Sequence, residues 1–179
     1  MDRLVAIGDI HGCVHTLKDL LNRVSYSSQT DTLVFIGDYI DRGYFSYEVV
    51  SMLIKLRHQV GKDKVVCLRG NHEQMAIDAY RHGNYPLWYR NGGRSTEYSF
   101  EKKGQDLANA VSWFETLPLV YDTPEIIFCH AGLSYSFTLY LKVTLITRRQ
   151  YSLPCLLNVK SMRRYTFSYT SRSLIKSRL

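Results

Sequence analysis

The stretch Gly37-Asp38-Tyr39-Ile40-Asp41-Arg42-Gly43 places two carboxylates and one guanidinium between two glycines. It follows Thr32-Leu33-Val34-Phe35-Ile36, an apolar and largely β-branched run that is typical of a buried strand. A strand that ends in such a loop brings charge to the carboxyl edge of a sheet, where open α/β folds bind ligands. Taken alone, the stretch could equally be a turn with a solvated Asp–Arg pair, so the flanking motifs have to decide.

Three further apolar runs also end in polar clusters, and they span residues 4–7, 64–69 and 126–129. The clusters that follow them are Gly8-Asp9-Ile10-His11-Gly12, Gly70-Asn71-His72-Glu73 and His130-Ala131-Gly132. Apolar residues at helical spacing recur between the runs, at residues 14–24, 46–56, 73–80 and 106–117. Alternating strands and helices predict an α/β fold with parallel strands. One polar strand end could be an accident, but four predict a site.

Two segments depart from this alternation. Residues 84–105 contain several turn-forming residues, so we expect mixed, turn-rich structure there. Within it, Trp88, Asn91 and Gly93 are expected to be architectural rather than catalytic. Residues 133–145 alternate between apolar and mostly polar side chains, which is a strand pattern much longer than the usual five or six residues.

Composition and charge narrow the class of protein. The 179 residues suffice for one domain with a substantial core, and no run is long and apolar enough for a membrane span. Residues 1–125 hold all 16 acids and 14 of the 23 Lys and Arg, whereas residues 126–179 hold no acid and the other nine basic residues. The net charge of +7 therefore comes from the tail, and we expect neither a specific nucleic-acid partner nor a membrane partner. Without a signal peptide, a cytoplasmic location with unpaired cysteines is expected.

The strand-end residues form a set with a common chemistry: Asp9, His11, Asp38, Asp41, Arg42, Asn71, His72 and His130. Carboxylates, imidazoles and an amide suit a divalent metal such as Mn²⁺, Fe²⁺ or Zn²⁺. Asp9 and His11 offer two ligands from one strand end, and Asp38 could bridge two metals.

The remaining members of the set would complete the chemistry. Asn71 and His130 could complete a second metal site beside the first. Arg42 would hold a phosphoryl oxygen through its planar fork. His72 could protonate a leaving alkoxide while Asp41 orients its ring.

These four motifs, in this order and spacing, resemble the signatures of the PPP-type, calcineurin-like metallophosphoesterases, in particular the bacterial and bacteriophage serine/threonine protein phosphatases. The resemblance covers residues 3 to about 134. It implies an α/β, calcineurin-like β-sandwich flanked by helices. It also implies two divalent metals, Mn²⁺ above all, held by Asp9, His11, Asp38, Asn71 and His130. By the same resemblance, His72 and Asp41 form the acid dyad and Arg42 binds substrate phosphate, while a metal-bridging hydroxide attacks phosphorus directly.

The resemblance fails after His130. The family completes its second metal site with another histidine well downstream, but none of the six histidines follows His130. It also takes a second phosphate-binding arginine from its C-terminal half, and no flanking motif assigns that role to Arg148, Arg149, Arg163 or Arg164. We therefore expect a catalytic domain over residues 1–134 and an atypical basic tail over residues 135–179. The fold would then be incomplete in its C-terminal half, as in a truncated or frame-shifted gene product.

The sequence thus favours a metal-dependent serine/threonine phosphoprotein phosphatase acting on phosphoprotein or phosphopeptide substrates. One alternative is a related hydrolase of dinucleoside polyphosphates, in which the third motif usually ends in Asp where this chain has Glu73. Another is a catalytically impaired fragment. A simpler alternative remains for each site residue, since the carboxylates could form surface ion pairs, Asn71 could only cap a helix, and His130 could be a core histidine. The sequence gives no oligomeric state.

Overall fold

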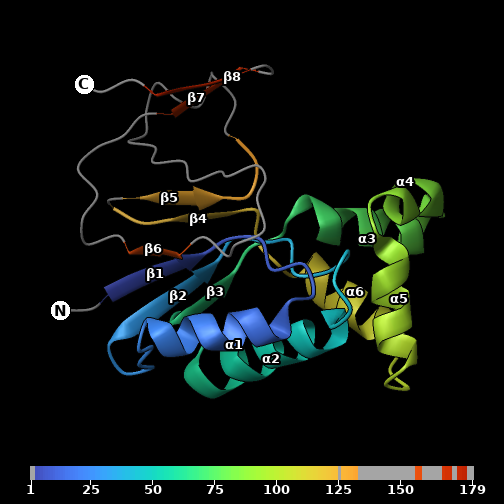
Figure 1. Ribbon diagram of the computed structural model, residues 1–179, viewed down its shortest axis with the longest axis horizontal. Coiled ribbons are helices and arrows are strands. Elements are labelled where there is room, and N and C mark those ends of the chain that lie inside the picture. The colour runs from blue at the N-terminus through green and yellow to red at the C-terminus, as the bar shows by residue number, and fades with distance from the viewer. Residues whose placement is uncertain (1–2, 125, 133–155, 159–166, 171–172, 177–179) are drawn as a thin grey trace.

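The computed structural model describes residues 3–124, 126–132, 156–158, 167–170 and 173–176, with side chains placed up to residue 132 (Figure 1). Its main sheet has the strand order β3-β2-β1-β6. These strands are β1 (Arg3–Ile7), β2 (Asp31–Phe35), β3 (Val65–Cys67) and β6 (Leu156–Asn158). The first three strands pair in parallel, as the alternation of strands and helices predicts, and β6 pairs antiparallel with β1.

The fourth apolar run belongs to a different sheet. It forms β5 (Ile127–Cys129), which pairs antiparallel with β4 (Val120–Asp122), a strand that the sequence did not predict. The expectation of parallel strands is therefore wrong for this run. Only a short connection separates β4 from β5, and a short connection permits an antiparallel hairpin but not a parallel crossover. A further antiparallel pair consists of β7 (Phe167–Thr170) and β8 (Ser173–Lys176).

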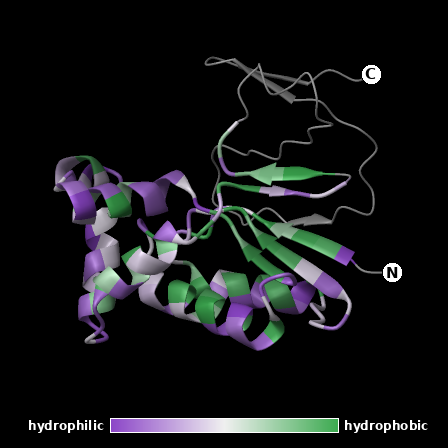
Figure 2. Cartoon of the chain, turned by 180° about the vertical axis from the view of Figure 1, so that it is seen from behind, coloured by the Kyte–Doolittle hydropathy of each residue, from purple (hydrophilic) through white to green (hydrophobic). Residues whose placement is uncertain are grey.

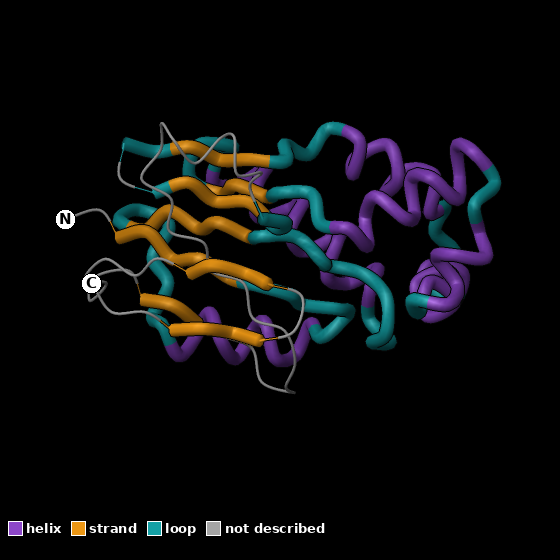
Figure 3. The backbone as a smooth tube through the Cα atoms, turned by 90° about the horizontal axis from the view of Figure 1, so that it is seen from above, coloured by secondary structure: helices purple, strands orange, loops and turns teal. Residues whose placement is uncertain are grey.

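The main sheet is buried on both faces. Helices α1 (Val14–Arg23) and α2 (Ser46–Val60) cover one face, and the β4–β5 pair lies over the other (Figures 1 and 3). Alternate strand residues such as Leu33 and Phe35 join the larger apolar cluster on the helical side, whereas Val34 joins a smaller cluster with Phe128 of β5. Two covered faces explain the nearly continuous apolar runs of these strands (Figure 2).

A helical lobe extends from the carboxyl ends of the strands (Figures 1 and 3). It consists of α3 (Asn71–His82), α4 (Tyr85–Arg90), α5 (Gly93–Glu101) and α6 (Leu107–Glu115). The expectation of turn-rich structure over residues 84–105 is wrong, because α4 and α5 occupy most of that segment. Pro86 lies in the first turn of α4, where proline is tolerated, and Gly92 caps α5 with a left-handed backbone.

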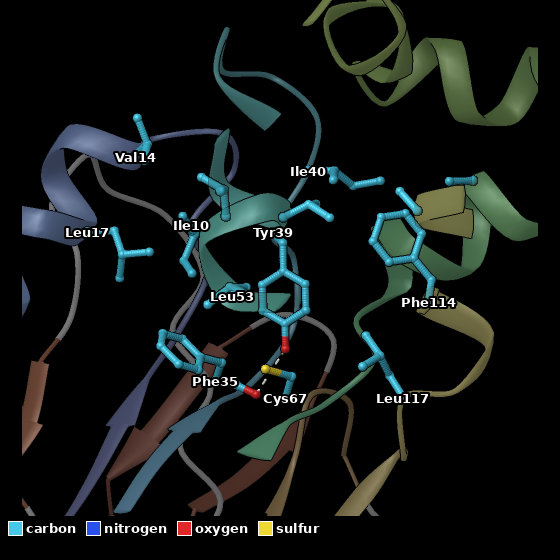
Figure 4. Close-up of a cluster of buried hydrophobic side chains, with 14 of the residues drawn as sticks. Ile10, Val14, Leu17, Phe35, Tyr39, Ile40, Leu53, Cys67, Phe114 and Leu117 are labelled. Atoms are coloured by element: carbon cyan, nitrogen blue, oxygen red, sulfur yellow. Dashed lines mark hydrogen bonds between the residues drawn. The ribbon is translucent and has the colours of Figure 1, made fainter. Parts of the chain in front are cut away.

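Tyr39 anchors the loop that follows β2. Its side chain is fully buried and points into the larger apolar cluster between Phe35, Leu53 and Cys67 (Figure 4). The hydroxyl lies 2.6 Å from the carbonyl oxygen of Leu68 and 3.1 Å from that of Phe35. The loop with Asp38 and Asp41 is therefore fastened to the core at its centre.

Other expectations have mixed outcomes. Cys67 and Cys129 are free, buried cysteines, as expected, and Cys13 is free and exposed. The long strand expected over residues 133–145 lies outside the described residues, and the boundary at residue 134 stays a prediction. None of the helices described is long and apolar enough to cross a membrane. The cytoplasmic location also stays a prediction.

Candidate metal centre and catalytic site

The structure brings the eight predicted site residues together beyond the carboxyl ends of the strands. Asp9 and His11 follow β1, the stretch 38–42 follows β2, and Asn71 and His72 begin α3 just after β3. His130 reaches the same place from the end of β5 in the second sheet. A shared sheet edge therefore collects side chains from positions as far apart as residues 9 and 130.

Asp38 lies at the centre of the candidate metal ligands. Its Oδ2 atom lies 3.6 Å from Nε2 of His11, and its Oδ1 atom lies 3.3 Å from Nε2 of His130. Two groups of potential ligand atoms converge within 4.8 Å, one formed by His11, Asp38 and His72 and the other by Asp9, Asp38 and His130. Asp38 belongs to both groups, so each of its oxygens faces a different histidine.

Backbone carbonyls fix the orientation of both histidine rings. Nδ1 of His11 donates to the Ile40 carbonyl at 2.8 Å, and Nδ1 of His130 donates to the Ile36 carbonyl at 2.8 Å. Each ring therefore points Nε2 toward the ligand cluster, which is the usual orientation of a metal-binding histidine. Nε2 of His130 lies 2.8 Å from Oδ1 of Asn71. We use the term ligand cluster for Asp9, His11, Asp38, Asn71 and His130.

The ligand cluster fits a divalent cation. Nε2 of His11 is buried and has no hydrogen-bond partner, which is an uncommon state for a buried polar atom in a native protein. Asp9 and Asp38 lie close enough to repel each other, and Asp38 raises the pKa of Asp9. Carboxylates, neutral imidazoles and an amide oxygen form a donor set for metals such as Mn²⁺, Fe²⁺ or Zn²⁺. An unpartnered nitrogen beside two carboxylates is what a bound cation would resolve.

The members of the ligand cluster differ in the direction in which their pKa values are shifted. Burial and the nearby charge of Asp38 raise the pKa of Asp9, and burial lowers the pKa of His11. Burial opposes ionisation of Asp38, but its hydrogen bond with His130 and the charges and backbone bond of His130 and His72 together outweigh burial and hold the pKa of Asp38 below the ordinary value. Burial likewise opposes the charge on His130, yet Asp38 and Asp9 raise the pKa of this ring to about 9. The carboxylates of Asp38 and Asp9 therefore favour positive charge at the position of His130.

Asp41 and His72 form a buried pair beside the ligand cluster. Nδ1 of His72 donates to Oδ2 of Asp41 at 2.7 Å, and both side chains are almost completely buried. Nη2 of Arg42 lies 3.0 Å from Nε2 of His72. Because a guanidinium only donates, Nε2 of His72 accepts this bond. The exposed Arg42 side chain thus covers the reactive nitrogen of His72.

Glu73 is a site residue whose role the sequence did not predict. Its carboxylate is fully buried and accepts backbone N–H bonds from Asp38 at 2.9 Å, Tyr39 at 2.8 Å and Gly70 at 2.8 Å. Burial raises the pKa of Glu73 to about 7. A glutamate at the third position of a helix is a capping-box signal, and that signal could have indicated the bond to Gly70. The two bonds to the loop after β2 depend on tertiary structure.

Gly70 itself allows the close approach of two motifs. A Cβ atom at this position would collide with the carboxylate and the backbone nitrogen of Asp38. The backbone before α3 therefore packs directly onto the loop after β2. The amide of His72 also donates to Oδ1 of Asp38 at 3.1 Å, so the third motif helps to hold the central carboxylate.

The backbone is strained where the candidate site residues lie. In the described part of the chain, positive φ angles occur at five non-glycine residues: His11, Ser25, Asp38, Asp41 and Arg42. Four of the five are predicted site residues, with φ between 45° and 72°. Such conformations each cost about 1–3 kcal/mol and persist where the surrounding structure enforces them, commonly at functional sites. Sequence motifs gave no sign of this strain.

Comparison with known proteins identifies the family. The family model described as calcineurin-like phosphoesterase matches residues 2–170. The chain therefore belongs to the calcineurin-like phosphoesterases, as the four motifs indicate. The match continues beyond residue 134, where the resemblance in the motifs ends.

Relatives and solved structures refine this result. The chain is 33% identical to the serine/threonine-protein phosphatase 2 of Salmonella typhimurium over 116 residues, which cover 65% of this chain and 50% of that protein. The structure of a candidate diadenosine tetraphosphatase is 27% identical with a TM-score of 0.53, over 74% of this chain and 51% of that one. A cold-active protein-tyrosine phosphatase from a Shewanella species is 21% identical with a TM-score of 0.61, over 78% and 44%. The last likeness shows the fold alone. The chain spans about half the length of these proteins.

Proposed function

We propose that the protein is a metal-dependent serine/threonine phosphoprotein phosphatase that hydrolyses phosphomonoesters. The observation that carries the proposal is the position of the Asp41–His72 pair, with Arg42 on its outer side, directly beside the ligand cluster around Asp38. An acid, a phosphate-binding cation and a carboxylate-rich metal site are the groups that phosphoryl transfer to water requires. The similarity to the phosphatase of Salmonella typhimurium supports the choice of substrate.

The ligand cluster would hold the metals. Calcineurin-like phosphoesterases use two divalent metal ions. By the resemblance in the motifs, Asp9, His11 and Asp38 would hold one of them, while Asp38, Asn71 and His130 would hold the other. When bound, such ions activate a water molecule as the nucleophile and neutralise charge on the phosphoryl oxygens. Mn²⁺ is the proposed metal. Asp38 has the central role because its two oxygens already face the two histidines.

Arg42 and His72 would act on the substrate itself. The guanidinium of Arg42 would bind the phosphoryl oxygens, and its exposed position lets it turn toward a ligand. That movement would release Nε2 of His72, which accepts the Arg42 bond in this structure. Nε2 could then carry the proton that His72 donates to the leaving serine or threonine oxygen, while Asp41 holds Nδ1.

Hydrolysis of a phosphoserine peptide by the purified full chain tests the proposal. We expect activity that depends on added Mn²⁺ and that falls in the His72→Asn variant. Wild-type activity no higher than that of the variant would contradict the proposal. It would instead support a catalytically impaired protein, the alternative that follows from the lack of any histidine after His130.

A second candidate function is hydrolysis of dinucleoside polyphosphates. It is favoured by the likeness to the candidate diadenosine tetraphosphatase, at 27% identity. Glu73 favours the protein phosphatase, because the dinucleoside polyphosphate hydrolases usually have Asp at this position of the motif. The side chain of Glu73 is longer than that of Asp and reaches the amides of both Asp38 and Tyr39. Assays with a phosphoserine peptide and with diadenosine tetraphosphate, side by side, distinguish the two. Faster turnover of the dinucleotide would overturn our choice of substrate.

A further inference from the structure

We propose that Trp88 and Thr96 are positioning residues that hold the Asp41 carboxylate in the one orientation that directs His72 toward the leaving group. This proposal rests on the proposed phosphatase function and assigns a task to the segment of residues 84–105. The sequence suggested only an architectural role for Trp88.

The contacts to Asp41 come from two helices of the lobe. Nε1 of Trp88, on α4, donates to Oδ2 of Asp41 at 2.9 Å and lies 3.1 Å from Oδ1. Oγ1 of Thr96, on α5, donates to Oδ1 of Asp41 at 2.6 Å and accepts from the Asp41 amide at 2.8 Å. All three side chains are fully buried. Asp41 therefore has neutral donors on both oxygens besides the ring of His72.

These contacts fix the plane of the carboxylate. With His72 as its one partner, a carboxylate could rotate about its bond to Cβ and present either oxygen to the ring. Thr96 holds Oδ1, and Trp88 bridges both oxygens, so Oδ2 stays directed at Nδ1 of His72. Since Thr96 also binds the Asp41 amide, the backbone and the carboxylate are held by the same hydroxyl. We use the term dyad network for Asp41, His72, Trp88 and Thr96.

The turn between α4 and α5 is built for this arrangement. A Cβ atom on Gly93 would lie 2.5 Å from the indole ring of Trp88, and one on Gly92 would lie 2.9 Å from the backbone nitrogen of Arg42. The absence of side chains lets the indole and the loop after β2 approach the turn closely. Gly92 also has φ +103°, a conformation that other residues rarely adopt. The turn thus lets Trp88 of α4 and Thr96 of α5 reach the same carboxylate.

The proposal has a chemical signature, because the dyad network acts on the leaving group. A serine alkoxide is a poor leaving group and needs a proton as its bond to phosphorus breaks. A p-nitrophenolate leaves readily without one. Misorienting His72 should therefore slow hydrolysis of a phosphoserine peptide far more than hydrolysis of p-nitrophenyl phosphate. General damage to the fold or to the ligand cluster would slow both reactions alike.

The experiment compares Thr96→Val, which removes the hydroxyl at constant shape, with Thr96→Ser, which keeps it. Trp88→Phe removes the indole donor, and Trp113→Phe is its matched control, because Trp113 is half-buried and contacts Tyr39 and Phe114 rather than Asp41. For Thr96→Val and Trp88→Phe we expect kcat on the phosphoserine peptide to fall at least about 10-fold, and by no more than the roughly 10²–10⁴-fold that a general acid supplies. The kcat on p-nitrophenyl phosphate should change by less than about threefold, and KM should stay constant.

A second measurement does not depend on activity. The imidazole N–H resonances of His72 are recorded by NMR on the full chain and assigned by their loss in His72→Asn. The Nδ1–H signal should persist in wild type, Thr96→Ser and Trp113→Phe, and should broaden or disappear in Thr96→Val and Trp88→Phe. If Trp88→Phe does not fold, the two Thr96 variants decide alone.

The outcomes separate the two proposals. An unchanged Nδ1–H signal in Thr96→Val, or equal losses on both substrates, overturns the positioning role. Wild-type protein that hydrolyses neither substrate overturns the proposed function, whereas the NMR comparison still decides whether Thr96 and Trp88 hold the dyad network.

Discussion

The ligand cluster and the dyad network lie side by side but are built in opposite ways. In the ligand cluster, Asp9 and Asn71 are exposed, two carboxylates lie close together, and Nε2 of His11 has no partner. In the dyad network every side chain is almost fully buried, and both oxygens of Asp41 are engaged by hydrogen-bond donors. The ligand cluster therefore contains negative charge and a nitrogen without partners, whereas the polar groups of Asp41 in the dyad network all have partners.

This difference matches two different tasks. A metal site gains affinity from charge and lone pairs that the protein leaves uncompensated until the cation binds. A general acid has to keep one geometry throughout the reaction, so its partners must be satisfied without any ligand. Arg42 joins the halves, since it covers His72 in this structure and is free to move to a phosphate. Four substitutions test this difference.

Asp38→Asn should have the largest effect. Asp38 belongs to both groups of candidate ligands, so we expect metal-stimulated hydrolysis to disappear. Mn²⁺ affinity should fall by more than about 100-fold, beyond the 10–100-fold typical of losing an outer-shell partner. Isothermal titration calorimetry measures the affinity, with Asp19→Asn, an exposed acid on α1, as control. Mn²⁺ binding within a few-fold of wild type would show that Asp38 is no ligand.

His72→Asn should separate the two halves. We expect kcat on the phosphoserine peptide to fall by roughly 10²–10⁴-fold, since the proposed general acid is lost. Mn²⁺ affinity should stay within a few-fold of wild type, because both ring nitrogens of His72 have other partners, Asp41 and Arg42, and the variant retains the backbone N–H bond to Asp38. Calorimetry and steady-state kinetics on the same samples check both expectations. A large loss of metal affinity would mean that His72 belongs to the ligand cluster.

Glu73→Ala tests the hydrogen bonds that hold the loop after β2 and the start of α3, on which both the ligand cluster and the dyad network depend. The variant leaves three buried N–H groups, of Asp38, Tyr39 and Gly70, without their acceptor. At about 1–3 kcal/mol for each unsatisfied group, the free energy of unfolding should fall by about 3 kcal/mol or more. Thermal unfolding of the metal-free protein gives the change in Tm, and the exposed Glu101→Ala is the matched control. Equal Tm values for the two variants would contradict this support role.

Asp31→Asn should have the smallest effect, because it lies away from both halves. The guanidinium of Arg3 binds both carboxylate oxygens of Asp31, at 3.0 and 2.6 Å, and holds the pKa of Asp31 below its ordinary value of 3.8. A lowered pKa gives stability that is present above pH 3.8 and is lost as the pH falls through the folded-state value. We expect Tm to be slightly lower in the variant at pH 7 and the difference to shrink in acid. A difference that is constant down to pH 2 would exclude this origin.

The sequence predicted much of the candidate site because its motifs are local. Each motif follows an apolar run, and strands that share a sheet bring their ends together. The sequence alone therefore predicts that these eight residues lie close together. His130 belongs to the predicted site, but the reason for including it is only partly right. Its strand lies in the second, antiparallel sheet and not in the parallel sheet. The sequence does not predict α4 and α5, because proline and glycine, which stand at the starts of these short helices, are also typical of turns.

Local sequence patterns are sufficient to predict the order of the first strands, the chemistry at their ends and the family of the protein. These depend on hydrophobic periodicity and on residue types within a few positions of each other. The hydrogen-bond partners of the stretch from Gly37 to Gly43, in contrast, depend on the tertiary structure. Glu73 binds its backbone, while Trp88 and Thr96 hold Asp41 from helices about 50 residues away. Such bonds join side chains that no local pattern relates, because packing of the helical lobe against the sheet edge creates them.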